Sequence, residues 1–194
     1  MTRTHLLPAL LAALALSACG ESPVAPTAVA GDALSLDRTG TTRDGARQSP
    51  LLRRLLDQAL ARVRRARGEE GVRRATVAVR AQVDSAAAAR RAGDLERAEI
   101  HAARAQLETA RVVVRVLGPR TVVRVTEELR AALRRVTERL SAAESNGSDV
   151  SAARATVERA SARLRESKAA MDAREPARAL VLAARAADLL ASLR

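Results

Sequence analysis

The side chain in this sequence most suited to covalent chemistry is the thiol of Cys19, the only cysteine in the 194 residues. It follows an apolar run, residues 6–16, and the small residues Ser17 and Ala18. A thiol acts as a nucleophile through its thiolate form and can be acylated or oxidised. Because the chain has no second cysteine, no disulfide can form within it, and the expected chemistry is modification of this one sulfur.

Other groups that could support catalysis or bind a metal are sparse. Beyond Cys19 the only histidine is His101, which lies beside Ile100 on the flank of a predicted helix. Catalysis requires a converging acid, base or nucleophile, and zinc sites usually combine several histidines or cysteines. The sequence has neither a Gly-rich phosphate loop nor a G-x-S-x-G motif. We therefore predict no catalytic residue, metal ligand or cofactor, and interpret His101 as a partly exposed surface residue.

The first 18 residues have the organisation of a secretory signal peptide. Arg3 precedes the apolar run, and small residues follow it. A membrane-spanning helix needs about 20 apolar residues, and Gly20 and Glu21 end this run too early for that. If this is an ordinary secretory signal peptide, Cys19 remains a free thiol; the next residues suggest a more specific alternative.

The order Leu16-Ser17-Ala18-Cys19 resembles the lipobox of bacterial lipoproteins. The resemblance implies cleavage between Ala18 and Cys19, with Leu16, Ser17 and Ala18 as the recognition residues. It also implies acylation of the Cys19 thiol and of the new amino terminus. Two or more acyl chains hold a protein stably on a bilayer, at about 0.8 kcal/mol per buried methylene. Gly20, where an aspartate would favour inner-membrane retention, favours the outer membrane facing the periplasm, if the organism has one.

The basic charge is almost entirely arginine. The net charge is +12, and Lys168 is the only lysine. A GC-rich genome can produce this bias, and attraction to anionic lipid or another polyanion is the functional alternative. The candidate anion-binding patch surrounds one predicted turn, which also contains Glu69 and Glu70. It consists of Arg62, Arg64, Arg65, Arg67, Arg73 and Arg74. Nucleic acid is not an expected partner, because the chain has no aromatic residue on which a base could stack.

Helical periodicity extends from Ser49 to the last residues of the chain. Residues 19–48 show no such period and are rich in Pro, Thr, Ala and Gly, which predicts a flexible tether of about 30 Å. Beyond them, apolar residues recur three and four positions apart. The predicted helix boundaries are Gly68, Gly93-Asp94, Gly118-Pro119, Asn146-Gly147-Ser148 and Arg174-Glu175-Pro176. We predict an all-α, antiparallel bundle of about six helices.

Three features of these helices can be tested against the structure. Ser49 and Asp94 are predicted helix N-caps. The third helix is predicted to face inward through Ile100, Ala103, Leu107, Ala110, Val114 and Leu117. The last is apolar except for Arg178, Arg185, Asp188 and Ser192, so we expect it to be the most buried. Residues 112–125 are dense in β-branched side chains and could form a hairpin, but the three-four spacing continues through them and favours helix.

The sequence also resembles itself. Leu52-Arg53-Arg54 recurs 81 positions later, Arg74-Ala75-Thr76-Val77 recurs after 80, and Ala102-Ala103-Arg104-Ala105 recurs after 81. The nearly constant shift predicts a duplicated three-helix unit, residues 49–118 and 119–194, although chance matches in an Ala- and Arg-rich chain are the alternative.

The turn Ala92-Gly93-Asp94 and the alanines after it resemble the helical hairpins of uncharacterised small helical bacterial lipoproteins. In the second copy Arg174 and Glu175 replace Gly and Asp. This resemblance implies no activity. Taken together, the sequence predicts a lipid-anchored, non-enzymatic envelope protein that binds or scaffolds an unidentified protein partner. The alternative is a protein whose amphipathic helices associate with anionic lipid or another polyanion at the membrane surface.

Overall fold

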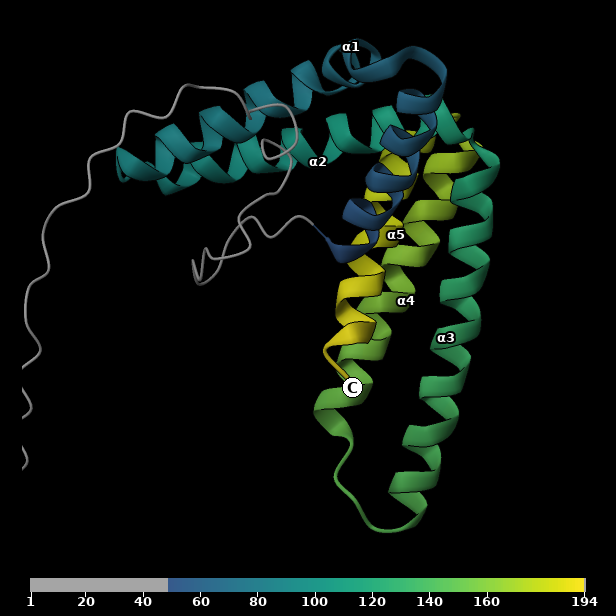
Figure 1. The fold of residues 1–194 in the computed structure, drawn as a ribbon. Coiled ribbons are helices and arrows are strands. Elements are labelled where there is room, and N and C mark those ends of the chain that lie inside the picture. Colours follow the sequence, from purple (N-terminus) through teal and green to yellow (C-terminus); the bar gives the residue numbers. More distant parts are fainter. Residues whose placement is uncertain (1–48, 194) are drawn as a thin grey trace, which may run out of the picture. The chain divides into compact units, whose positions relative to one another are not determined.

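Helices form nearly all of the chain that the structure describes. The computed structural model describes residues 49–193, and within this range it contains α-helices and no strand. The helices are α1 (Pro50–Arg91), α2 (Leu95–Leu117), α3 (Arg120–Ser145), α4 (Ser151–Asp172) and α5 (Pro176–Ala191) (Figure 1). The predicted all-α class is therefore confirmed.

The predicted number of helices is wrong by one. Gly68 was expected to end a first helix, but the structure continues as α1 through a kink at this residue. Gly68 adopts φ 62° and ψ −166°, a conformation that is essentially restricted to glycine, and regular helix resumes after it. The described residues thus contain five helices, the first of which changes direction at Gly68 (Figure 1).

Helix α5 lies at the centre of the packing. It contacts each of the four other helices, and α3, α4 and α5 run alongside one another in Figure 1. Eight of its 16 residues are buried, including Leu180, Ala183 and Ala186, which are 0% exposed. The four polar residues predicted to face solvent from this helix are all exposed: Arg178, Arg185, Asp188 and Ser192. The prediction that the last helix is the most buried is confirmed.

The second half of α1 and the whole of α2 form an antiparallel hairpin (Figure 1). Its interface is built largely from small side chains, with Ala86 and Ala89 of α1 and Ala98 and Ala102 of α2 all buried. Alanines allow two helix backbones to approach closely, whereas a large residue at the same positions would hold them apart.

The predicted inward face of α2 is wrong at its first two positions. Ile100 is 45% exposed and Ala103 is also exposed. The face that packs inward is instead marked by Ala98, Ala102 and Ala105. Among the described helices, Figure 1 shows α1 beside the beginning of α2, so a single face is buried there, and the large Ile100 lies outside it.

Two further predictions about helix ends have different outcomes. Asp94 caps α2 by accepting a hydrogen bond from the backbone N–H of Arg97 at 2.9 Å. Ser49 occupies the N-cap position of α1, but its side chain makes no capping bond; its hydroxyl donates to Asp188 Oδ1 at 2.8 Å instead. The capping role predicted for Ser49 is therefore wrong, and its contact joins the first and last helices.

The segment of residues 112–125 is helical, as predicted. It contains the end of α2 and the beginning of α3, separated at Gly118 and Pro119. Val113 and Val122 on either side of this break are fully buried. The β-branched residues thus supply bulk to the core rather than forming a hairpin of strands.

Candidate functional site

The predicted lipidation site lies outside the residues that the structure describes. Cys19 and the recognition residues Leu16, Ser17 and Ala18 precede residue 49, as do the whole signal peptide and tether. Acylation of Cys19 therefore stays a prediction from the sequence.

The six arginines of the predicted anion-binding patch flank the kink of α1, and all of them are exposed. Arg62, Arg64, Arg65 and Arg67 precede Gly68, and Arg73 and Arg74 follow it. We call these six residues the kink arginines. Their side chains project from the two arms of α1 that meet at the kink.

Two glycines shape this kink. Gly68 supplies the backbone conformation, and Gly71 allows the second arm to lie close to the first. A Cβ atom at residue 71 would lie 2.5 Å from Cβ of Arg67 and 3.2 Å from Cγ1 of Val63. Since such an approach is too close for any side chain, glycine at residue 71 is required for the two arms to meet as they do.

Glu69 and Glu70 form ion pairs with three of the kink arginines. Arg64 pairs with Glu69 at 2.6 Å, Arg74 pairs with Glu70 at 3.0 Å, and Arg73 also pairs with Glu70. Exposed ion pairs of this kind contribute only about 0–1 kcal/mol to stability. The remaining three, Arg62, Arg65 and Arg67, have no ion-pair partner within residues 49–193. Because Arg73 and Arg74 share Glu70, most of the uncompensated positive charge of the kink, but not all of it, lies on its first arm.

His101 contributes to helix packing. Its Nδ1 lies 2.9 Å from Oε1 of Gln82, so the pair bridges α2 and α1, and the histidine is half-buried. In the described part of the chain there is no group of three or more His, Cys, Asp or Glu residues that could hold a metal ion.

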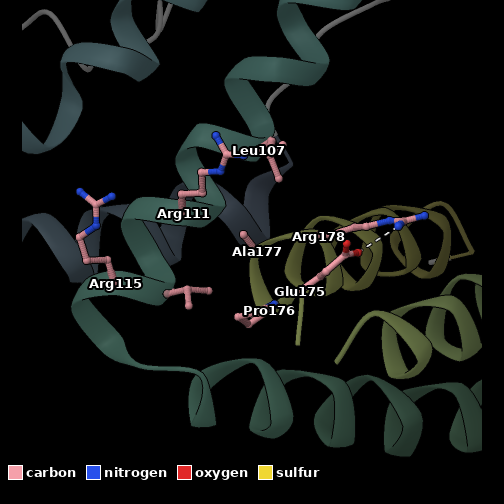
Figure 2. Close-up of a pocket in the computed structure, with 8 residues that line it drawn as sticks. Leu107, Arg111, Arg115, Glu175, Pro176, Ala177 and Arg178 are labelled. Atoms are coloured by element: carbon pink, nitrogen blue, oxygen red, sulfur yellow. Dashed lines mark hydrogen bonds and ion pairs between the residues drawn. The ribbon is translucent and has the colours of Figure 1, made fainter. Parts of the chain in front are cut away.

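A cleft that the sequence did not indicate lies between α2 and the beginning of α5 (Figure 2). Its volume is about 500 Å³. Four lining residues are apolar and four are charged. The apolar ones are Leu107, Val114, Pro176 and Ala177; the charged ones are Arg111, Arg115, Glu175 and Arg178.

The charges around this cleft are unequally compensated. Arg178 Nη1 lies 3.0 Å from Glu175 Oε2, and Arg111 Nη1 lies 2.5 Å from Oε1 of Glu108. Arg115 has no ion-pair partner among residues 49–193. The cleft therefore combines an apolar floor with one uncompensated guanidinium group.

The sequence indicates that the α2 residues of this cleft are neighbours, but it does not indicate the cleft itself. Leu107, Arg111, Val114 and Arg115 recur at helical spacing, which places them on neighbouring parts of one helix surface. Nothing in the spacing indicates that the start of α5 packs beside them, because that contact joins residues more than 60 positions apart.

Comparison with protein-family models finds no match to the chain, and comparisons with curated proteins and with solved structures find no similar chain. Among residues 49–193, no helix combines the length and the hydropathy that crossing a membrane requires.

Proposed function

We propose that this protein is a lipid-anchored helical bundle of the cell envelope with a non-enzymatic binding or scaffolding role. The observation that carries the proposal is the order Leu16-Ser17-Ala18-Cys19 at the end of an apolar run near the start of the chain. Cleavage before Cys19 and acylation of its sulfur and amino terminus would attach the protein to the membrane. Gly20 favours the outer membrane, on its periplasmic face, where the organism has one.

The folded part of the chain is consistent with this role. The apolar side chains of residues 49–193 are directed largely into contacts between helices, among them Leu52, Leu180 and Val113. A bundle that buries its own apolar faces does not need lipid in order to fold, so the membrane contact can be left to the acyl chains. This favours a compact bundle over amphipathic helices lying on the lipid surface.

We also propose that the bundle arose by duplication of a three-helix unit. Two turns 81 positions apart have the same hydrogen bonds, which is compatible with duplication, although the turn of residues 146–148 shares this common helix-end pattern. The N–H groups of Ala92, Gly93 and Asp94 donate to the carbonyls of Ala88, Arg90 and Ala89; those of Ala173, Arg174 and Glu175 donate to Ala169, Met171 and Ala170. Buried residues also recur at this shift on the helices that follow, as with Ala98 and Ala179.

The kink arginines support a second candidate function, contact with anionic lipid or another polyanion. Arg62, Arg65 and Arg67 are exposed and lack acidic partners within the described range. A local excess of positive charge attracts phosphate-bearing surfaces, and the attraction weakens as salt rises.

Washing of isolated membranes distinguishes these two functions. High salt screens electrostatic attachment but leaves acyl chains in the bilayer. We expect the wild-type protein to remain in the membrane pellet after a high-salt wash, and Cys19→Ser to be released. Release of both proteins, or retention of both, would contradict anchoring through Cys19.

Binding to vesicles tests the kink arginines separately. Replacing Arg62, Arg65 and Arg67 with Gln should weaken binding to anionic vesicles and reduce its salt dependence, because each lost contact removes one released counterion. The matched control replaces Arg134, Arg135 and Arg139 with Gln; these are exposed residues of α3 that make no ion pair in the described structure. Equal losses in the two variants would mean diffuse attraction with no site.

A further inference from the structure

We infer that the cleft between α2 and the start of α5 binds an organic anion that carries one carboxylate on a short apolar chain. This binding function goes beyond membrane anchoring and depends on neither Cys19 nor the kink arginines. It is carried by the shape of the cleft, the composition of its floor and the balance of charge around it.

The size and lining of the cleft suit a small amphiphile. Small-molecule sites usually enclose about 300–1,000 Å³ and combine apolar walls with a few polar groups that fix orientation. This cleft has a volume of about 500 Å³, and its floor is formed by Leu107 and Val114 of α2 and by Pro176 and Ala177 of α5. Figure 2 shows Pro176 and Ala177 on the side of the cleft that faces α2.

The charge balance indicates a single negative charge on the ligand. Glu108 compensates Arg111, and Glu175 compensates Arg178, which leaves Arg115 as the one uncompensated charge at the cleft. A guanidinium can hold a carboxylate through two parallel hydrogen bonds. Arg115 extends along α2 away from Pro176 in Figure 2, and its flexible side chain must turn toward the cleft to make these bonds.

Two other clefts in the described structure have a similar balance of charge, and the titration below should show no octanoate shifts at their residues. A cleft of about 540 Å³ between α4 and α5 has Glu166 and Asp188 beside its three arginines. A cleft of about 820 Å³ between α3 and α5 has Glu138 between Arg135 and Arg139. In both, arginines exceed acids by one, which is the same excess that Arg115 gives the cleft between α2 and α5 once Glu108 is counted.

Titration of the full chain with octanoate, monitored by methyl NMR, tests the inference. Octanoate should shift the methyl signals of Leu107 and Val114 in a saturable manner. Acetate, which lacks the apolar chain, and octanol, which lacks the charge, should each bind at least about tenfold more weakly. Octyl phosphate should bind no more tightly than octanoate; tighter binding would overturn the assignment to a monocarboxylate.

Two variants and one control locate the binding. Arg115→Gln should weaken octanoate binding by about tenfold, the effect of losing one hydrogen bond to a charged group. Ala177→Leu should also weaken it, because the larger side chain fills the floor without changing charge. Arg104→Gln, an exposed arginine of the same helix outside the cleft, should leave binding unchanged. Equal effects of Arg115→Gln and Arg104→Gln, or octanoate shifts that do not include Leu107 and Val114, would overturn the inference.

Discussion

Helices α2 and α5 carry the same pattern of buried alanines on one face and differ on the other. Ala98, Ala102 and Ala105 of α2 correspond, 81 positions later, to three buried alanines of α5. On the opposite faces, Ile100 is 45% exposed, whereas Val181, at the matching position of α5, is 9% exposed. One alanine face is thus compatible with both a peripheral and a central helix.

The number of neighbouring helices explains this difference. The α2 residues around Ile100 are covered mainly by α1, while α5 contacts all four other helices (Figure 1). The alanine face thus sets how closely two helices pair, and the composition of the opposite face sets whether further helices cover the pair.

The largest expected difference between α2 and α5 is in the stability lost when a large side chain outside the alanine face is truncated. Leu180→Ala removes a side chain that is 0% exposed and should lower the free energy of unfolding by about 2–5 kcal/mol. Ile100→Ala, which shortens a side chain of α2 that is 45% exposed, should have an effect within about 0.5 kcal/mol. Urea denaturation monitored by circular dichroism measures both. Similar losses from the two substitutions would contradict the distinction between central and peripheral helices.

The shared faces should instead respond alike. Ala98 and Ala179 are 2% and 0% exposed, and a larger residue at either position would force the paired helices apart. Ala98→Leu and Ala179→Leu should therefore each lower the free energy of unfolding by about 1–3 kcal/mol. A large loss at one position with none at the other, in the same urea assay, would show that the two faces are not equivalent.

The turns that precede these helices should give smaller and opposite effects. Gly93 has φ 76°, and Arg174, at the matching position, has φ 61°, a left-handed conformation that disfavours side chains. Gly93→Ala should lower the free energy of unfolding by about 1 kcal/mol. Arg174→Gly should raise it by a smaller amount, because glycine also increases the freedom of the unfolded chain. Denaturation midpoints of the two variants should move in opposite directions, and a destabilised Arg174→Gly would contradict this reading of the turn.

The smallest effect concerns Asp188, which matches Leu107 of α2. Although Asp188 is exposed as a whole residue, partial desolvation of its carboxyl group raises its pKa, and the hydrogen bond from the buried Ser49 partly opposes the rise. Because the folded state binds this proton more tightly, its contribution favours folding at acid pH and weakens as pH rises through the raised pKa. Asp188→Asn keeps an oxygen that can accept from Ser49 and removes the titration. Relative to this variant, the free energy of unfolding of the wild type should fall as pH increases above the usual carboxyl range. A difference in stability between the two proteins that does not vary with pH would contradict the raised pKa of Asp188.

Much of the architecture follows from the spacing of apolar residues. The polar stripe of α5 was correctly predicted because a helix with so few polar positions must be surrounded by others. The break in helical backbone at Gly68 was predicted, but the continuation of α1 past it was not, since glycine both ends helices and permits kinks. The close approach of Gly71 to Val63 and Arg67 is seen only in the folded chain.

The two candidate sites differ in how much of each could be predicted from the sequence. The kink arginines are neighbours along the chain, so their grouping was visible before the fold was known. The cleft joins α2 to α5 through a tertiary contact, which periodicity does not encode. The exposure of Ile100 was missed for a related reason, because spacing along one helix does not reveal how many other helices cover it.

The central claim is that Cys19 attaches this bundle to a membrane. Growth with a labelled fatty acid, followed by purification of the full-length protein and of Cys19→Ala, tests it most directly. We predict label in the wild-type protein that resists removal by detergent and denaturant, and none in Cys19→Ala. Equal labelling of the two proteins, or a wild-type protein without label, would contradict the claim.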